Sequence, residues 1–232
     1  MRIPLYIEMS DKNVLIIGGG GVGTSRAKKF ISAGANVKVL SLDFSDELKS
    51  LEKENKLELI KASAYDSNIL EKLLEWANIV TVATEDLGVN DVVKKIARNK
   101  KCFLNFANDS RETEVVVPFE GEFEGIKFAV TTEGKSGVVA RMVRDSILEM
   151  LKKDDEIISL LKAMDYLKRY MKSEKVPVDL RMKLYFEVSS DEKFRNLVRE
   201  GKVEEAKLYA EELVKEYSSG KRKFRVKSSL NF

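Results

Sequence analysis

Residues 13–23 read Asn-Val-Leu-Ile-Ile-Gly-Gly-Gly-Gly-Val-Gly, and this stretch decides the fold. The run Val14–Ile17 is apolar, largely β-branched and too short for a helix, so it predicts a buried strand. Beyond the glycines, Ala27, Phe30 and Ile31 recur at helical spacing, and Gly34 is placed to end that helix. The stretch therefore predicts a strand, a tight glycine turn and a helix in succession.

The same alternation of strand and helix continues to about residue 112. Further strands are predicted at 37–40, 57–60, 79–83 and 102–106, and helices at 67–76 and 89–99. Strands that alternate with helices of this length form a parallel sheet with right-handed crossovers. The apolar run Ile-Val-Thr-Val-Ala at 79–83 fits a strand that is covered on both faces. The sequence thus predicts an α/β protein with a Rossmann-type parallel sheet.

The pattern changes beyond residue 112. Residues 114–118 and 126–130 predict two antiparallel strands joined by an acidic turn, and the apolar positions from 138 to 151 predict an amphipathic helix. Everything after Asp154 has a helical pattern, with breaks at 177, 189–190, 201 and 218–220. We therefore expect a Rossmann nucleotide-binding domain at 1–112, a small mixed α/β segment at 113–150 and a helical C-terminal domain at 151–232.

Composition excludes several classes of site. The 232 residues include no histidine, which excludes Ser-His-Asp and Cys-His nucleophile systems and leads us to expect no metal site. The single cysteine, Cys102, cannot form an intramolecular disulfide, which suits a reducing compartment. No run approaches the roughly 20 apolar residues of a membrane span, and the first residues do not resemble a signal peptide. We expect a cytoplasmic protein without a membrane partner.

Charge gives no reason to expect a nucleic-acid partner. The chain has 41 basic and 38 acidic residues, a net charge of +3. The stretch Lys-Arg-Lys-Phe-Arg-Val-Lys at 221–227 leaves a nucleic-acid contact open, but a frayed, solvated terminus is the simpler interpretation. The expectation is therefore a protein that binds a small molecule and no nucleic acid.

The glycine turn predicts a dinucleotide site. Gly18, Gly20 and Gly23 satisfy the pattern G-x-G-x-x-G between a predicted strand and a predicted helix, which is the context that the motif requires. Glycine permits the tight turn, the approach of the pyrophosphate and the packing of helix on strand, while the helix N-terminus offers free N–H groups. Gly21 and Val22 complete the loop, so all five residues are predicted to bind the cofactor.

Asp43 predicts which dinucleotide binds. It lies 20 residues beyond Gly23, next to Leu42 and just past the second strand. A carboxylate there accepts hydrogen bonds from the adenosine ribose and repels a 2′-phosphate, which favours NAD over NADP. The alternative is that Asp43 only caps the following segment.

Six short segments, taken in order, resemble the precorrin-2 dehydrogenase (siroheme synthase) family, and the resemblance spans residues 3 to about 150. They are Ile-Pro-Leu-Tyr-Ile at 3–7, the glycine loop with Gly23 in place of the usual alanine, Ala-Thr-Glu-Asp at 83–86 with Asn90 downstream, Asn-Phe-Ala-Asn-Asp at 105–109, Val-Pro at 117–118, and Thr-Glu-Gly-Lys-Ser at 132–136 leading to Ala-Arg at 140–141. Two further departures are Glu133 within the usual glycine pair and Gly137 in place of proline.

The resemblance implies an NAD-dependent oxidoreductase. The family oxidises precorrin-2 to sirohydrochlorin on the route to siroheme, with NAD as the hydride acceptor, and some members also insert iron. The family is typically a homodimer whose middle segment makes the subunit contact. Two alternatives stay open for this chain: a dehydrogenase that is also a ferrochelatase, and an NAD-sensing module without chemistry. The segment 132–141 favours an enzyme, because it has no purpose in a pure sensor.

The resemblance also implies site residues. The family's catalytic aspartate directly follows Asn-hydrophobic-hydrophobic, a position that Asn108 fills here, while Asp109 comes one residue later. Either the loop is shifted and Asp109 serves as the proton acceptor, or the family's carboxylate is absent from this chain; both residues are catalytic candidates. Thr84 and Glu85 follow the fourth strand and Asn105 lies near the end of the fifth, so they face the crevice at the carboxyl edge of the sheet. For a tetrapyrrole substrate with many carboxylates we expect contacts from Asn105, Lys135, Ser136 and Arg141.

Overall fold

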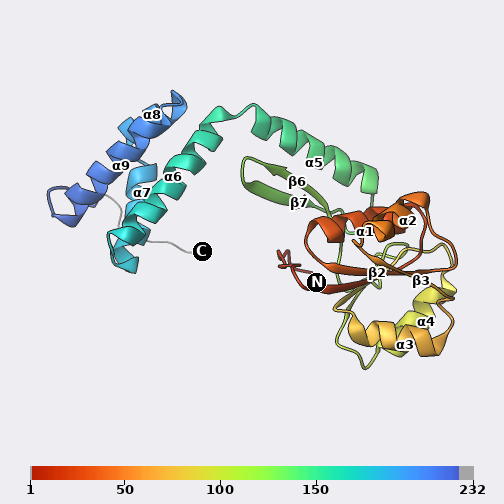
Figure 1. Ribbon diagram of the computed structural model, residues 1–232. Coiled ribbons are helices and arrows are strands. Elements are labelled where there is room, and N and C mark those ends of the chain that lie inside the picture. The colour runs from red at the N-terminus through yellow and green to blue at the C-terminus, as the bar shows by residue number, and fades with distance from the viewer. Residues whose placement is uncertain (1, 225–232) are drawn as a thin grey trace. The chain divides into compact units, whose positions relative to one another are not determined.

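Five parallel strands form the sheet of the computed structural model, which describes residues 2–224 (Figure 1). The strands are β1 (Asn13–Ile17), β2 (Asn36–Ser41), β3 (Glu58–Lys61), β4 (Ile79–Val82) and β5 (Phe103–Phe106). Their order across the sheet is β3-β2-β1-β4-β5, so the chain reverses direction of travel between β1 and β4. This order places a crevice outside the carboxyl ends of β1 and β4, where dinucleotides bind in such folds.

Side chains of β1 alternate between two apolar layers. Val14 and Ile16 pack with α1 (Gly21–Ser32) and α2 (Asp46–Lys53), whereas Leu15 and Ile17 pack with α3 (Ser67–Trp76) and α4 (Gly88–Ala97). Figure 1 shows the two helix pairs on opposite faces of the sheet. Both faces of β4 are covered, so all four of its residues are buried; three are apolar, and the fourth is Thr81. The α/β prediction and the Rossmann-type order are confirmed.

Residues 114–118 correct one prediction, because they do not form a strand. Glu114 and Val115 donate their backbone N–H groups to the carbonyl of Leu104, at 2.8 and 3.2 Å, and the Glu114 carboxylate accepts from the Leu104 N–H at 2.8 Å. The segment thus satisfies the free edge of β5 instead of pairing with 126–130. Val115 and Val117 are partly buried against the apolar layer that contains α1, so their apolar character reflects this packing and not a strand.

The antiparallel pair starts later than expected. It consists of β6 (Phe119–Phe123) and β7 (Ile126–Val130), joined by Glu124 and Gly125, which have φ of +48° and +87°. Two central residues with positive φ are typical of the tight hairpin turn whose twist matches the strands. The acidic, glycine-bearing turn is therefore confirmed, and only the first strand is displaced.

Helices follow from residue 137 onwards, and the predicted breaks between them are confirmed. They are α5 (Gly137–Lys152), α6 (Asp155–Ser173), α7 (Val178–Ser189), α8 (Glu192–Arg199) and α9 (Val203–Ser218). Asp154 and Asp191 cap α6 and α8 by accepting from the backbone N–H groups of Ile157 and Phe194. Phe194, Leu167 and Leu184 lie fully buried in the core shared by α6 to α9.

Part of the basic tail is ordered, contrary to the expectation of a frayed terminus. Arg222 donates to the carboxylate of Asp191 at 2.6 Å, and Phe224 stacks on Tyr217 with 4.6 Å between ring centroids. Residues 225–227 of the stretch 221–227 lie outside the described residues. Aromatic burial and a paired guanidinium hold residues 222 and 224 against the helices.

The chain divides into two compact units. The first contains the residues up to Phe119 together with Thr131–Ala140, and the second contains Glu120–Val130 and the residues from Arg141 onwards. The glycine loop, the strand ends and the 131–136 loop all belong to the first unit. As boundaries of independently folding domains, positions 112 and 150 stay predictions.

Candidate functional site: a dinucleotide crevice with two polar loops

At three positions of the loop only glycine fits, because a backbone carbonyl group occupies the space where a side chain would begin. A Cβ on Gly18, which has φ of +120°, would overlap the carbonyl of Ala83 at the end of β4. A Cβ on Gly19 would overlap the carbonyl of Asp43, and one on Gly23 would overlap the carbonyl of Gly18. The loop is therefore wedged between the ends of β2 and β4. Gly23 stands where the family usually has alanine. Here α1 lies so close to the Gly18 carbonyl that only glycine fits at this position.

Gly20 and Gly21 are glycines for a different reason. No atom of the described chain lies within 4 Å of a Cβ placed on either residue. Gly20 is the N-cap of α1, no side chain caps that first turn, and no acidic residue lies in it. Open space over free N–H groups at a helix N-terminus fits a pyrophosphate, because both the donors and the helix dipole favour an anion. The residues present thus fit a bound dinucleotide.

Apolar side chains surround this loop at the surface. Val22 is 54% exposed, Leu42 61% and Leu87, just before α4, 62%. Asp43 is also exposed, and its backbone lies against Gly19. Leu87 was not among the predicted cofactor-binding residues. Apolar groups beside an anion-binding helix end suit a ligand that has both a flat base and phosphates.

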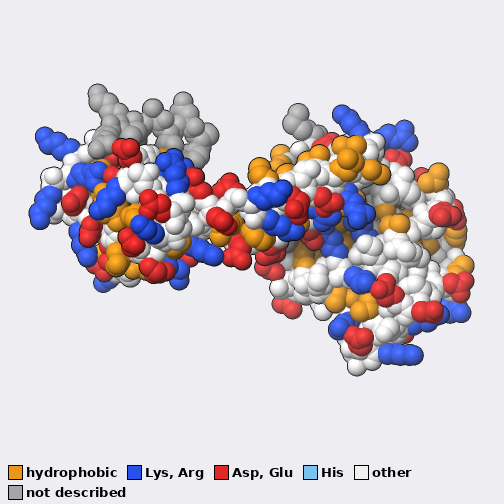
Figure 2. All heavy atoms as spheres, turned by 90° about the horizontal axis from the view of Figure 1, so that it is seen from above, with side chains coloured by type: hydrophobic (Ala, Val, Ile, Leu, Met, Phe, Trp, Pro, Cys, Tyr) orange, Lys and Arg blue, Asp and Glu red, His pale blue; other side chains and the backbone are white. Residues whose placement is uncertain are grey.

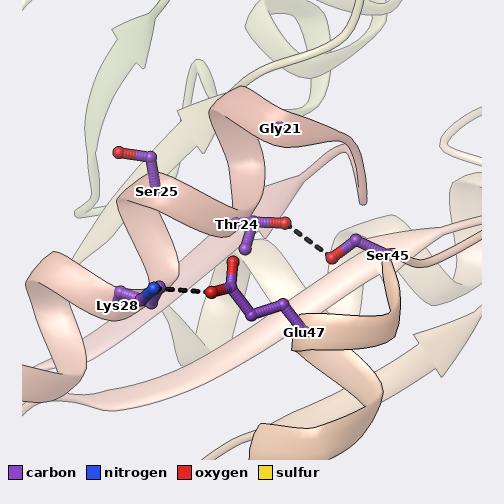
Figure 3. A pocket seen from close by; sticks show the side chains of 6 residues that line it. All are labelled: Gly21, Thr24, Ser25, Lys28, Ser45 and Glu47. Atoms are coloured by element: carbon purple, nitrogen blue, oxygen red, sulfur yellow. Dashed lines mark hydrogen bonds and ion pairs between the residues drawn. The ribbon is translucent and has the colours of Figure 1, made fainter.

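A hollow of about 290 Å³ adjoins the loop between α1 and α2. Figure 3 shows Thr24 directed at Ser45 and Lys28 directed at Glu47 across it; the hydroxyl oxygens lie 2.8 Å apart and the ion pair measures 2.7 Å. Ser45 also caps α2 by accepting from the Leu48 N–H. These contacts fix the segment that carries Leu42 and Asp43 relative to the glycine loop, and none of them was predicted from the sequence.

The ends of β4 and β5 meet through an amide. Asn108 donates from Nδ2 to the carbonyl of Thr84 at 2.8 Å, and its Oδ1 accepts from Nδ2 of Asn90 at 2.9 Å. The orientation of the amide is fixed, because the Thr84 carbonyl only accepts and so must face the NH₂ group. Asn90 is buried, while Asn108 is exposed. A carboxylate in place of Asn108 would set two acceptors against each other.

Glu85 and Asp86 end the loop after β4. Both are exposed, and Asp86 accepts a hydrogen bond from the Tyr65 hydroxyl at 2.8 Å. This hydrogen bond raises the pKa of Tyr65, because the phenol must keep its proton to donate. The rim of the crevice at Thr84 and Glu85 is thereby tied to the loop before α3.

Asp109 turns toward its own loop. Its Oδ1 accepts from the Arg111 backbone N–H at 2.9 Å, and the Arg111 guanidinium lies 3.3 Å from the same oxygen. The hydrogen bonds from Arg111 lower the pKa of Asp109, because they stabilise the ionised carboxylate. Asp109 is therefore ionised at neutral pH, and it is a weak base.

Asn105 is buried below the crevice. It is 5% exposed, and its Nδ2 donates to the carbonyl of Val115 at 2.9 Å. That bond ties the 114–118 segment to β5. A contact of Asn105 with substrate stays a prediction.

Lys135 and Ser136 lie in the first unit, next to the loop of Asp109. Ser136 begins α5: its hydroxyl accepts from the Val139 N–H at 3.2 Å, and its own N–H donates to the Thr132 hydroxyl at 2.9 Å. Lys135 is exposed. Arg141 belongs to the second unit, where it lies 3.9 Å from the Asp145 carboxylate. Packing of Gly134 on Ser110 places the loop of Lys135 and Ser136 next to the loop of Asn108 and Asp109, whereas Arg141 belongs to the second unit.

Comparisons with known proteins identify similar chains and a shared fold. Residues 5–119 match the family described as "Putative NAD(P)-binding". The chain is 27% identical to a "Putative precorrin-2 dehydrogenase" of Methanocaldococcus jannaschii, over 83% of this chain and 92% of that protein. The resemblance to the precorrin-2 dehydrogenase family is confirmed. The solved structure of "SirC, precorrin-2 dehydrogenase" matches 91% of this chain and 100% of its own, with a TM-score of 0.68 at 20% identity, so the two share a fold.

Longer relatives match only in part. The chain is 28% identical to a "Siroheme synthase 2" of Pectobacterium atrosepticum, over 64% of this chain but 31% of that protein. It thus spans about a third of the length of that relative.

Within residues 2–224, no group of three or more Cys, Asp or Glu side chains is arranged to hold a metal ion. In the same range, none of the helices has the length and apolar character needed to cross a membrane.

Two glycine variants should separate folding from cofactor binding. Gly20→Leu should leave thermal stability unchanged but abolish NAD binding, since its side chain enters open space that the pyrophosphate needs. Gly23→Ala should lower stability by about 1–3 kcal/mol and weaken binding as well, since the methyl group collides with the Gly18 carbonyl. Thermal unfolding and calorimetric titration would measure both effects. Equal loss of stability in the two variants would contradict this division of roles.

Proposed function

We propose that this protein is an NAD-dependent dehydrogenase that oxidises precorrin-2 to sirohydrochlorin. The observation that carries the proposal is the alignment to the "Putative precorrin-2 dehydrogenase", which covers 92% of that relative and so is not limited to the nucleotide-binding part. The shared fold with SirC, which extends over 91% of this chain, supports it. The uncapped N-terminus of α1 beside Gly20 and Gly21 supplies a fitting cofactor site.

Each polar group of the crevice has a role in this proposal. Bound NAD would supply the hydride acceptor, and Asp43 favours it over NADP by repelling a 2′-phosphate. Asn108 holds the substrate over the ends of β4 and β5 through an amide whose orientation is fixed by Thr84 and Asn90. Lys135 and Ser136 contact carboxylates of the tetrapyrrole, and Arg141, which belongs to the second unit, stays a separate prediction of a substrate contact.

Asp109 takes the proton in the proposed reaction. Its low pKa is compatible with this role, because a substrate that has lost a hydride is cationic and releases a proton to a weak base. Arg111 keeps the carboxylate ionised, so Asp109 can accept a proton throughout the neutral range. A separate acceptor with a pKa near neutral is then not needed.

The proposed activity is tested by incubating the full chain with precorrin-2 and NAD. The absorbance should change to that of sirohydrochlorin while NADH forms, and NADP should react much less well because of Asp43. Ferrous iron added after completion distinguishes a dehydrogenase from one that also inserts iron. Binding of NAD without any oxidation would refute the enzyme and favour a sensing module.

Asp109→Asn and Asn108→Asp test the two catalytic assignments. Asp109→Asn should keep NAD affinity and lower kcat about 100-fold, the lower end of the range for loss of a general base. Asn108→Asp should not raise activity, because its carboxylate would face the Thr84 carbonyl. Steady-state kinetics of both variants would decide. Wild-type turnover in Asp109→Asn would leave water as the acceptor, and a gain in Asn108→Asp would show that the position is suited to a carboxylate.

Helix α5 supports a homodimer. It exposes a row of apolar side chains (Val138 72%, Val139 49%, Met142 63%, Val143 43% and Met150 56%), whereas its buried apolar residues are Ala140 and Leu151. Figure 2 shows hydrophobic side chains at the surface between charged ones. A 16-residue helix with such a face is marginal in water unless another surface covers it. The homodimer is proposed on this ground.

A cytoplasmic location of the protein stays a prediction.

Charge placed on this row should dissociate the dimer. Light scattering of the wild type should give twice the 26.3 kDa chain mass, and the double variant Val138→Asp, Met142→Asp should give the monomer mass. Lys152→Glu, which lies on α5 outside the row, is the matched control and should remain dimeric. A monomeric wild type at micromolar concentration would refute the proposal.

A further inference from the structure

Arg2 connects two loops that are far apart in the sequence. Its Nη2 donates to the carbonyl oxygens of Ser110 and Thr113, both at 2.7 Å. Its Nη1 lies 3.6 Å from the carboxylate of Glu133, which stands in the 131–136 loop. The Arg2 side chain is 28% exposed, so its hydrogen bonds are partly shielded from water. One guanidinium thus contacts the loop of Asp109 and the loop of Lys135 together.

Thr113 carries this contact to the end of β5. It is 6% exposed, and its hydroxyl accepts from the Phe106 N–H at 2.8 Å. The same hydroxyl lies 3.1 Å from the carbonyl oxygens of Phe106 and Asp109. The Thr113 hydroxyl therefore fixes the backbone on either side of Asn108 through Phe106 and Asp109. Arg2 in turn holds the backbone carbonyls of Ser110 and Thr113.

The loop at 131–136 also packs directly against the loop at 109–113. A Cβ on Gly134 would overlap the side chain of Ser110, and Gly134 has φ of +87°, so glycine is required on both counts. Glu133 also has positive φ, at +52°, and the Lys135 N–H donates to the Thr132 carbonyl at 3.1 Å to close the turn. This turn sets where Lys135 and Ser136 stand relative to Asn108 and Asp109.

We propose that Arg2 is a positioning residue that clamps these two loops together, so that Lys135 holds a substrate carboxylate while the ring lies over Asn108 and Asp109. The proposal rests on the proposed function for the identity of its substrate, but the clamp itself is a property of the loops. A planar guanidinium can serve two carbonyls and a carboxylate at once, whereas a lysine ammonium is a single point that cannot span them. If either loop were displaced, a substrate bound at Lys135 would no longer lie in the correct position over Asn108 and Asp109.

Arg2→Ala should lower kcat/KM for precorrin-2 about 100-fold, as expected when reacting groups are misplaced by roughly an ångström. The affinity for NAD and the melting temperature should stay those of the wild type, because Arg2 contacts neither the glycine loop nor the sheet core. Arg2→Lys should recover little of the loss, and added guanidinium ion should recover part of it in Arg2→Ala. Any affinity tag belongs at the C-terminus, so that the chain around Arg2 is unaltered.

Arg98→Ala is the control, and Glu133→Gln tests the contact with the second loop. Glu133→Gln removes the ion pair that joins Arg2 to the 131–136 loop, so it should lower kcat/KM in the same direction as Arg2→Ala but by a smaller factor, because the pair is exposed. Arg98 is an exposed arginine that follows α4, and its loss should change nothing. Wild-type kcat/KM in Arg2→Ala would overturn the proposal, and so would an equal loss of NAD affinity or melting temperature, which would indicate a merely structural role.

Hydrogen exchange gives a readout that does not depend on the reaction. Amides of 109–113 and 131–136 should exchange faster together in Arg2→Ala, while those of the glycine loop should not change. If the wild type fails to oxidise precorrin-2 but this paired increase is seen, the proposed function fails and the clamp stands. If neither loop changes its exchange, the clamp is refuted whatever the enzyme's activity.

Discussion

The contact of three backbone carbonyls with the glycine loop is the constraint on which the rest of the structure depends. The carbonyls of Ala83, Asp43 and Gly18 occupy the positions where side chains of Gly18, Gly19 and Gly23 would lie. Only because these side chains are absent can α1 start directly above the ends of β1 and β4. The free N–H groups of α1 then point out of the carboxyl edge of the sheet, which makes the site an anion site before any ligand binds.

The second half of the crevice is built from neutral amides and backbone groups, with charges kept at its edge. Asn90 and Asn108 form a chain of hydrogen bonds to the Thr84 carbonyl, and Asn105 and Thr113 fasten the following segment to β5. Buried amides cost less to desolvate than buried carboxylates, and each can both donate and accept. The charged groups, Asp109 with Arg111 and Glu133 with Arg2, stand where water still reaches them. Amides and backbone groups therefore set the geometry at the ends of β4 and β5, while the Arg2 guanidinium joins the two loops at the edge.

The helical unit differs from the crevice because its apolar core contains carboxylates that are buried and hydrogen-bonded. Its apolar core encloses Tyr217, whose hydroxyl donates to the buried carboxylate of Glu187 at 2.8 Å. Asp191 both caps α8 and accepts from Arg222, so one carboxylate joins a helix start to the end of the described chain. A buried charge is tolerated when every acceptor is used in this way. This unit extends the shared fold with SirC beyond the nucleotide-binding part.

Although it did not predict α2 (Asp46–Lys53), the sequence by itself determined the five parallel strands, the glycine loop and the breaks at 177, 189–190, 201 and 218–220. These features follow from local rules, because apolar periodicity and the conformational freedom of glycine act within a few residues. It did not determine that 114–118 pack against β5 without forming a strand, because their apolar pattern is the same in both cases. Nor could it decide how Asn108 and Asp109 are oriented or what Arg2 binds. Those outcomes depend on Thr84, Thr113 and Ser110, which supply or withhold hydrogen-bond partners only once the chain has folded. Tertiary structure therefore decided which polar groups face the ligand, since a side chain's direction is set by distant partners and not by its neighbours in the chain.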